Sequence, residues 1–314
     1  MILIISLAIM FSVVIGLVTQ FFVNTIIPPV WYVFKSFTQA AEQKLNRQGR
    51  SKQDVIFRGF LTYICVLALA VVVYFVVAGI EHAALSEGTV IVFQAVLLSL
   101  SISTLSLPLS FVNIGHKRLN HFGRAVGLDL ASQDFSGRIR KVTGLATIIY
   151  ARGLVSPILW FWFGGVAGLL FYTATQVCSF YTNRYDNHLG FALIPNVVAR
   201  IMNLVPDAIA GCFLVLCSLF VPGLKFKKAL KSLMFLKDAP VYGLGGIPLH
   251  ILSYASSTTL GGPVKSLDGQ SYKNEWVGEK GSSAQLTAAH PKIFIFTFSV
   301  MLVFTLFACI LLVV

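Results

Sequence analysis

The acidic residues are the first place to look for chemistry, because enzymes that act on phosphates or ATP use carboxylates to hold Mg²⁺. The chain has only 12 Asp and Glu residues among 314. The candidates are Asp129, Asp134, Asp186, Asp207, Asp268, Glu275 and Glu279. No HExxH, CxxC or Walker-type glycine loop accompanies them. Asp129 and Asp134 lie in a basic segment, where local charge balance is the alternative interpretation.

Three charged residues lie beside or inside apolar runs, where ionisable groups are costly and are therefore functional candidates. Arg152 directly precedes one long run, and Arg200 and Asp207 flank Asn203 and Pro206 before another. Seven residues separate Arg200 from Asp207, so both would lie on one face of a helix. The spacing predicts either a buried ion pair or side chains that extend to the membrane surface.

Neither the cysteines nor the histidines have the spacing of a metal or redox site. The five cysteines fall within or at the ends of apolar runs, where free cysteine behaves as a small apolar side chain. We therefore predict no metal ligands and no evident cofactor from the residues alone.

Composition determines the fold class that must position these residues. The chain is 56% hydrophobic and only 11% charged, whereas a soluble domain is about 25% charged. These values predict an all-α polytopic membrane protein that forms a single integral membrane domain over residues 1–314. We expect six spanning helices of about 20 apolar residues each. Their predicted bounds are Ile2–Asn24, Gly59–Ile80, Thr89–Val112, Gly153–Tyr181, Val205–Val221 and Ile293–Val314.

Two of these expectations are less clear-cut. Pro108 interrupts the third run, and residues 142–150 are apolar but short. That short stretch predicts either a buried half-helix or a re-entrant segment. No Lys or Arg precedes Lys35, so the first run is expected to be a retained span and not a secretory signal.

The basic residues behind the net charge of +12 are concentrated in three alternate segments between the expected spans. Segments 25–58, 113–142 and 222–292 hold 21 of the 24 Lys and Arg residues. The positive-inside rule then places these three segments in the cytoplasm and both termini outside, and we expect an integral protein of a bacterial inner membrane. The basic surface is expected to contact anionic lipid headgroups and not nucleic acid, because no aromatic-interleaved basic module is present.

The segment 222–292 is the largest polar stretch and divides into two parts. Residues 224–237 combine five lysines with apolar residues, which predicts an amphipathic helix at the membrane interface or an ordinary cytoplasmic helix. Residues 257–290 are rich in Gly, Ser and Thr and predict an ordered, turn-rich loop.

Five short motifs, in order along residues 25–290, resemble the CobD/CbiB family of membrane-bound cobinamide-phosphate synthases. They are LNRQGRS at 45–51 with Arg58-Gly59, VGLD at 126–129, VSPILW at 155–160 with Gly164-Gly165, NLVP at 203–206, and LGGP at 260–263 with WVG at 276–278. The last resembles the LGGPN…KPWIG loop of the family and is the most specific of the five.

The resemblance implies ATP-dependent amide formation that attaches aminopropanol phosphate to adenosylcobyric acid, with ATP, Mg²⁺ and a corrinoid as ligands. It implies Asp129 as the catalytic candidate. It also implies a substrate-binding set, which comprises Arg47, Arg50, Asn203, Gly261, Gly262, Pro263, Trp276 and Gly278.

The sequence departs from the family at most of its acidic positions. In the matching register, the family's acidic residues are replaced by Gly144, Ile148, Arg152, Ala199 and Arg200. The AmpE-type inner-membrane proteins share the span that here contains VSPILW and Gly164-Gly165, and they also lack this acidic set. Two functions therefore stay open, a cobalamin-pathway enzyme and a non-catalytic membrane regulator or scaffold of AmpE-like type.

Overall fold

The computed structural model describes residues 1–22, 28–47, 50–84, 86–102, 129–130, 133–182, 190–238, 246–265, 271–272 and 275–311. The chain falls into two compact units. The first unit comprises Met1–Phe11, Ile27–Ile102 and Ser156–Leu204. The second unit comprises Ser12–Ile26, Ser103–Val155 and Val205–Val314. Each unit is described by itself below.

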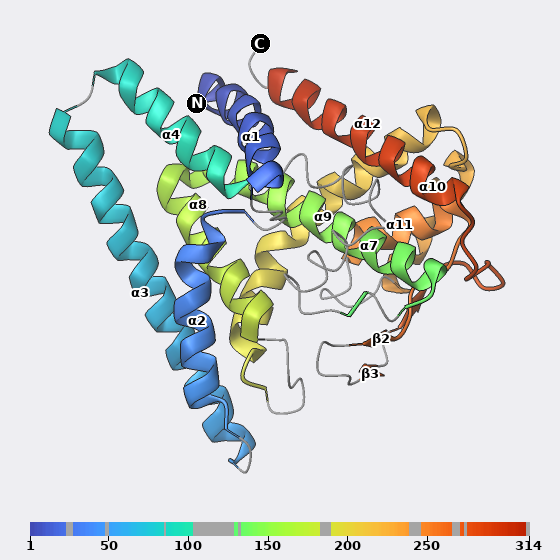
Figure 1. Cartoon of the computed structure of the whole chain (residues 1–314), viewed down its shortest axis with the longest axis horizontal. Coiled ribbons are helices and arrows are strands. Elements are labelled where there is room, and N and C mark those ends of the chain that lie inside the picture. Colours follow the sequence, from blue (N-terminus) through green and yellow to red (C-terminus); the bar gives the residue numbers. More distant parts are fainter. Residues whose placement is uncertain are drawn as a thin grey trace. The chain divides into compact units, whose positions relative to one another are not determined.

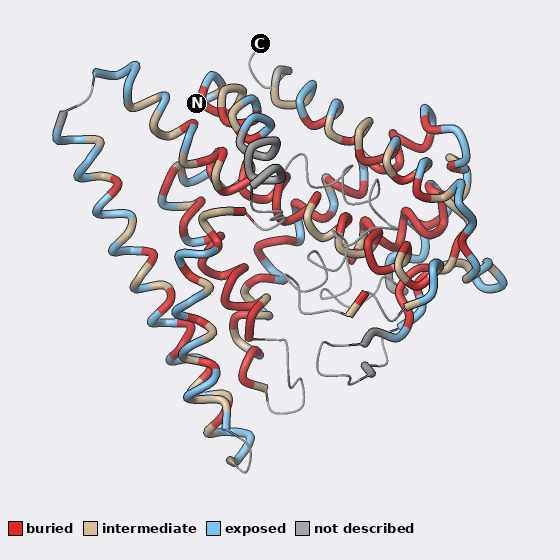
Figure 2. The backbone as a smooth tube through the Cα atoms, in the orientation of Figure 1, coloured by how far each residue is buried: buried red, intermediate tan, exposed pale blue. Residues whose placement is uncertain are grey.

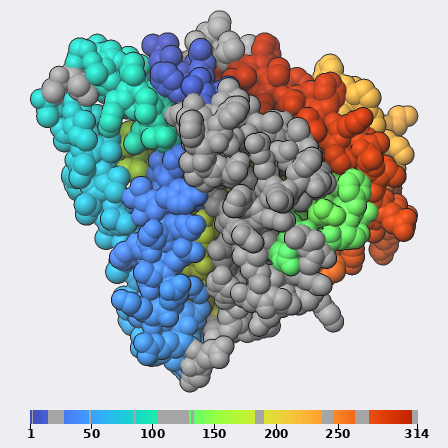
Figure 3. Space-filling view, viewed as in Figure 1, coloured from blue at the N-terminus to red at the C-terminus, as the bar shows by residue number. Residues whose placement is uncertain are grey.

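The first unit is a group of helices packed around α8. It contains the start of α1 (Ile2–Phe22), α2 (Trp31–Leu45), α3 (Lys52–Ala84), α4 (Glu87–Ser101), α8 (Ser156–Thr182) and the first part of α9 (Leu193–Phe220). α8 packs against α2, α3 and α4, and α2 lies beside α3 (Figure 1). A hydrogen bond of 3.0 Å between the hydroxyl groups of Tyr63 and Thr175 joins α3 to α8. In the space-filling view α2 and α3 form one continuous surface (Figure 3).

The second unit combines helices with a small β element. Its helices are α7 (Phe135–Tyr150), the π-helical turn η1 (Ala151–Val155), the later part of α9, α10 (Phe226–Ser232), the 3₁₀ segment η2 (Leu233–Asp238), α11 (Gly246–Ser256) and α12 (Ala289–Leu311). Asp134 caps α7 by accepting a hydrogen bond from the backbone N–H of Gly137. α7 packs against α11, α12 and strand β1.

Four two-residue strands lie between α11 and α12. They are β1 (Leu260–Gly261), β2 (Val264–Lys265), β3 (Ser271–Tyr272) and β4 (Trp276–Val277). β1 pairs antiparallel with β4, and β2 pairs antiparallel with β3. The turn-rich loop expected over residues 257–290 thus contains short paired strands, which the sequence did not predict.

Among the described residues, four helical runs are long and apolar enough to cross a membrane. They are Lys52–Ala83, Phe135–Thr182, Leu193–Phe220 and Ala289–Cys309. They correspond to the second, fourth, fifth and sixth expected spans. At the first expected span, α1 has 21 residues, but its described apolar part is only Leu3–Val14. At the third, α4 ends at Ser101 and residues 103–128 lie outside the described part, so the number six stays a prediction.

Two boundaries differ from the sequence prediction. α9 begins at Leu193, twelve residues before the expected Val205, so the end of the expected polar loop is helical. Residues 142–150 are the later part of α7, which continues through η1 into α8, so they do not form a separate half-helix; the re-entrant alternative stays a prediction. A π-helical turn inside a helix accommodates an extra residue, and such turns are frequent at functional sites.

Proline does not interrupt α9, because a side chain replaces the hydrogen bond that proline removes. Pro206 has no N–H to donate to the carbonyl oxygen of Met202, four residues earlier. The indole Nε1–H of Trp160 donates to that oxygen instead, at 3.2 Å. The helix therefore passes through a position where sequence alone suggests a boundary.

α3 has the exposure pattern expected of a helix that faces lipid. Only 28% of its most apolar window is buried, and Figure 2 shows exposed residues along most of its length. The exposed side chains include Val72, Phe75 and Val76. Since large exposed apolar surfaces on a soluble protein are unusual, this face fits contact with the hydrocarbon core of a bilayer.

The close approach of α3 to the backbone at Phe191 gives a stability test. A methyl group on Gly59 would collide with the carbonyl oxygen of Phe191, whereas one on Gly79 of the same helix would meet open space. We expect Gly59→Ala to lower the free energy of unfolding by about 1–3 kcal/mol, as overpacking does. Gly79→Ala should leave it unchanged or slightly higher. Thermal unfolding of the detergent-solubilised protein measures both, and equal midpoints for the two variants would contradict the proposed packing.

Candidate functional site

The two halves of the most specific motif meet in a hairpin in the second unit. Gly261 lies opposite Trp276 in the β1–β4 pair, and the backbone N–H of Gly262 donates to the carbonyl oxygen of Glu275 at 3.1 Å. Gly261 and Gly262 have φ angles of +79° and +76°, which favour glycine. A methyl group on Gly262 would lie only 2.7 Å from the indole ring of Trp276. The glycines are therefore required by the turn and by the position of the indole.

Two cations of α7 lie against this hairpin. The Lys141 ammonium donates a 2.6 Å hydrogen bond to the carbonyl oxygen of Gly262, and the Lys141 residue is only 7% exposed. The Arg140 guanidinium lies 5.2 Å from the centre of the Trp276 ring and donates to the carbonyl oxygen of Ala284 at 2.5 Å. We call Arg140, Lys141, Gly262 and Trp276 the hairpin site. It combines two positive charges with a half-exposed aromatic ring.

The sequence reasoning missed the two cations of the hairpin site. Arg140 and Lys141 were counted among the basic residues that indicate topology. The burial of Lys141 could not be read from that count. The detectable signal is the apolar stretch that follows directly, which makes α7 a packed helix instead of a loop.

Of the remaining predicted residues of the second unit, two lie next to the hairpin in the chain and one precedes α7. Pro263 is exposed directly after Gly262, and Gly278 is partly exposed directly after β4. Asp129 is partly exposed and lies six residues before α7 begins. Its proposed catalytic role stays a prediction.

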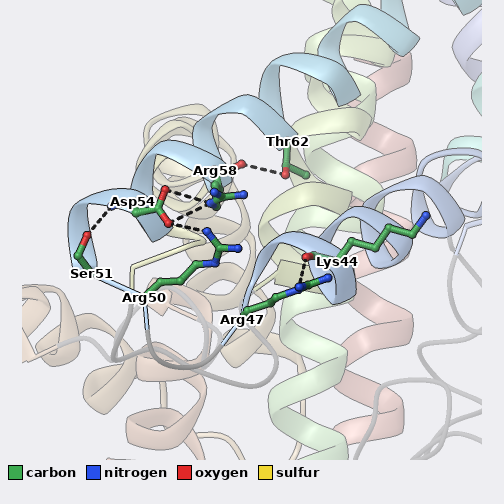
Figure 4. A network of polar contacts seen from close by, with 7 residues as sticks. All are labelled: Lys44, Arg47, Arg50, Ser51, Asp54, Arg58 and Thr62. Carbon is green, nitrogen blue, oxygen red and sulfur yellow. Dashed lines mark hydrogen bonds and ion pairs between the residues drawn. The ribbon is translucent and has the colours of Figure 1, made fainter.

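Arg47 and Arg50, predicted to bind substrate, belong to the first unit and lie where α2 ends and α3 begins (Figure 4). Arg50 donates to Asp54 at 2.9 Å, and Arg58 donates to the same carboxylate at 3.0 and 3.1 Å. Arg47 donates to the carbonyl oxygen of Lys44 at 3.1 Å. One carboxylate thus serves two arginines, which leaves this surface positively charged.

Asn203, also predicted to bind substrate, is fully buried in a hydrogen-bond network of the first unit. Its Oδ1 accepts from Ser156 at 2.8 Å and from Tyr172 at 3.0 Å. Its Nδ2 donates to the carbonyl oxygen of Ala199 at 2.7 Å. These bonds connect α8 with α9, so Asn203 has a clear packing role.

A second group of ionisable residues is buried in the second unit. Asp207 of α9 and Arg152 of η1 are each 6% exposed, and the charge of Arg152 acts on Asp207. A methyl group on Gly246, the first residue of α11, would lie 3.0 Å from Oδ2 of Asp207. His250, one turn further along α11, is 1% exposed. Arg200 by contrast is exposed and belongs to the first unit, so the charge identified next to Asp207 is that of Arg152.

The predicted amphipathic helix is present as α10 and η2, with a kink at Phe235. Leu230 and Met234 are exposed on it. Lys228 and Lys231 contact the carboxylate of Glu279 at 2.6 and 3.0 Å, which ties the helix to the chain after β4. These hydrogen bonds hold the pKa of Glu279 below its ordinary value of 4.5.

Within the described residues, no three His, Cys, Asp or Glu side chains are close enough together to hold a metal ion. The five cysteines are free thiols.

Comparison of the chain with family models, with curated proteins and with solved structures gives no match. The resemblance to the CobD/CbiB family therefore stays a prediction that is carried by the motifs themselves.

The buried charges of Arg152 and Asp207 give a double-variant test. Asp207→Leu would remove the acid whose charge acts on the buried Arg152 and should destabilise the protein by about 3 kcal/mol. Adding Arg152→Met to Asp207→Leu should restore most of that loss, since apolar side chains of similar volume replace such pairs well. The midpoint of unfolding in detergent measures this. Simple additivity of the two single effects would contradict a direct interaction.

The contacts of Glu279 give a pH test. Because its folded pKa is lowered, the carboxylate contributes stability above pH 4.5 and loses it as the pH falls through the folded pKa. Glu279→Gln should therefore lower the melting temperature at pH 7 and have no effect once the pH is well below 4.5. Glu87→Gln, an exposed position at the start of α4, is the control. A difference that persists unchanged into acid would refute the ion pairs.

Proposed function

We propose that the chain is an integral membrane protein of CobD/CbiB type that acts in cobalamin assembly. The implied reaction attaches aminopropanol phosphate to adenosylcobyric acid. The observation that carries the proposal is the hairpin site, where LGGP and WVG form one paired structure beside two cations of α7. Aminopropanol phosphate brings the phosphate group to the implied reaction, and a phosphate group is the kind of anion that such a site suits.

The membrane arrangement is part of the same proposal. We place six spans in a bacterial inner membrane, with both termini outside and the three basic segments facing the cytoplasm and anionic lipid headgroups. The four long apolar helices and the distribution of Lys and Arg support this arrangement.

The proposed ligand-binding residues are those implied by the resemblance. Asp129 is the proposed catalytic residue. Mg²⁺–ATP is the cofactor of the implied reaction, and no three His, Cys, Asp or Glu side chains converge among the described residues. We therefore assign no step to a metal ion.

The second candidate is a non-catalytic regulator or scaffold of AmpE-like type. The observation in its favour is Arg152, which stands where the family has an acid. Its side chain is buried with Asp207, so this position supplies a positive charge in place of a carboxylate. A metal-bound nucleotide would find less favourable charge there.

Complementation separates the two candidates. The chain is expressed in a bacterial strain that lacks its cobinamide-phosphate synthase and is supplied with cobyric acid. We expect cobalamin-dependent growth, because the proposal assigns the chain the missing step. Asp129→Asn should abolish this growth, and Glu87→Gln, with the same change of charge at an exposed position, should not.

Absence of growth, when the protein is present in the membrane at normal amounts, would contradict the enzyme and favour the regulator. Growth that survives Asp129→Asn would remove Asp129 from the site. A reporter fused to the C-terminus that reads out on the cytoplasmic side would refute the proposed orientation.

A further inference from the structure

Lys141 is a buried cation without a carboxylate partner among the described residues. Its ammonium group donates to the neutral carbonyl oxygen of Gly262, and the residue is only 7% exposed. An ammonium group in such a position loses most of its hydration, so it either gives up its proton or is kept charged by a compensating negative charge. A single carbonyl dipole supplies only part of that compensation.

The neighbouring charge makes the imbalance larger. Arg140 precedes Lys141 directly, and its positive charge acts on the Lys141 ammonium. The acid whose charge acts on Arg140 is Asp134, but that carboxylate caps α7 through Gly137. Each ion pair found among the described residues lies elsewhere, at Asp54 or at Glu279.

The contrast with α10 shows what a compensated lysine looks like in this unit. Lys228 and Lys231 share the Glu279 carboxylate, and both are more exposed than Lys141. The more deeply buried lysine is thus the one that lacks an acid in the described part of the unit.

We propose that the hairpin site binds a phosphate-bearing anion between Lys141, Arg140 and the β1–β4 turn. The proposal rests on the proposed function for the role of the hairpin as a ligand site, and it names the part of the ligand that is bound there. Lys141 has three donors and uses one for Gly262, and Arg140 has five and uses one for Ala284. The remaining donors match the tetrahedral oxygens of a phosphate group.

Trp276 gives the site a second property. Its residue is 52% exposed, and its ring lies beside Gly262 and close to Arg140. An anion that binds the Arg140 guanidinium will change the surroundings of the indole. The fluorescence of Trp276 should therefore report whether the hairpin site is occupied.

The test measures binding of inorganic phosphate and pyrophosphate to the full chain in phosphatidylcholine nanodiscs. We expect both anions to raise the melting temperature and to change the tryptophan fluorescence, with pyrophosphate acting more strongly. Lys141→Met should weaken binding by about tenfold or more, since it removes a charge-assisted contact. Its melting temperature without anion should be equal to or above that of the unmodified protein, because a buried charge has been removed.

Lys227→Met is the matched control, because Lys227 is exposed on α10 and loses the same charge. It should bind the anions like the unmodified protein. Retained affinity in Lys141→Met, or equal loss in Lys227→Met, would overturn the proposal. If Lys141→Met does not fold, Arg140→Gln takes its place and should weaken anion binding, and the Trp276 fluorescence change should decrease as salt is added. Trp276→Phe must abolish that fluorescence change.

A second arm identifies the source of the phosphate. Nanodiscs that contain phosphatidylglycerol, in buffer free of phosphate, should give the same Lys141-dependent stabilisation if a lipid headgroup fills the site. A response to pyrophosphate alone assigns the site to a soluble or corrinoid-linked phosphate. Anion binding without complementation would refute the cobalamin function but support the anion site. Complementation without anion binding would support the cobalamin function but refute the anion site.

Discussion

A buried cation in an apolar protein needs a negative charge or a carbonyl oxygen close by, and this chain has 24 basic residues but only 12 acidic ones. Several of these few carboxylates therefore interact with one or two particular cations. Asp54 serves two arginines, Glu279 serves two lysines, and Asp207 lies in the field of Arg152. Lys141 receives a backbone carbonyl instead. The positions of the acids thus determine which cations are neutralised inside the chain and which stay available for a ligand.

Neutral polar groups between helices also have specific partners inside the chain. Asn203 accepts from two hydroxyl groups and donates to a carbonyl, and Tyr150 of α7 bonds to Thr305 of α12 at 2.6 Å. Each of these contacts satisfies groups that would otherwise be costly away from water. In a bilayer no solvent replaces them, so they specify which helix faces meet.

Four of the expected spans correspond to long apolar helices, and they could be predicted because a run of about 20 apolar residues is a local property. The start of α9 could not, since the polar residues Asn196 and Asn203 look like a loop until their partners are known. The hairpin was expected only as an ordered loop, because the pairing of Leu260 with Val277 depends on contacts far apart in the chain. The burial of Lys141 could not be predicted for a related reason, because a buried lysine and a surface lysine look alike in a sequence. Glycine spacing pointed to the right segment, but only the packing of α7 shows which charges accompany it.

The bond between Trp160 and the carbonyl oxygen of Met202 has a consequence for how this chain can evolve. Pro206 creates an unmet acceptor, and the indole N–H supplies the donor. The indole N–H finds this acceptor only while the proline is present, although the Trp160 ring also stacks on Tyr172. Replacing Pro206 by a residue with an N–H would release position 160 to become any aromatic residue, whereas losing the indole first would be penalised. The two positions should accordingly covary among relatives, with the proline lost before the tryptophan.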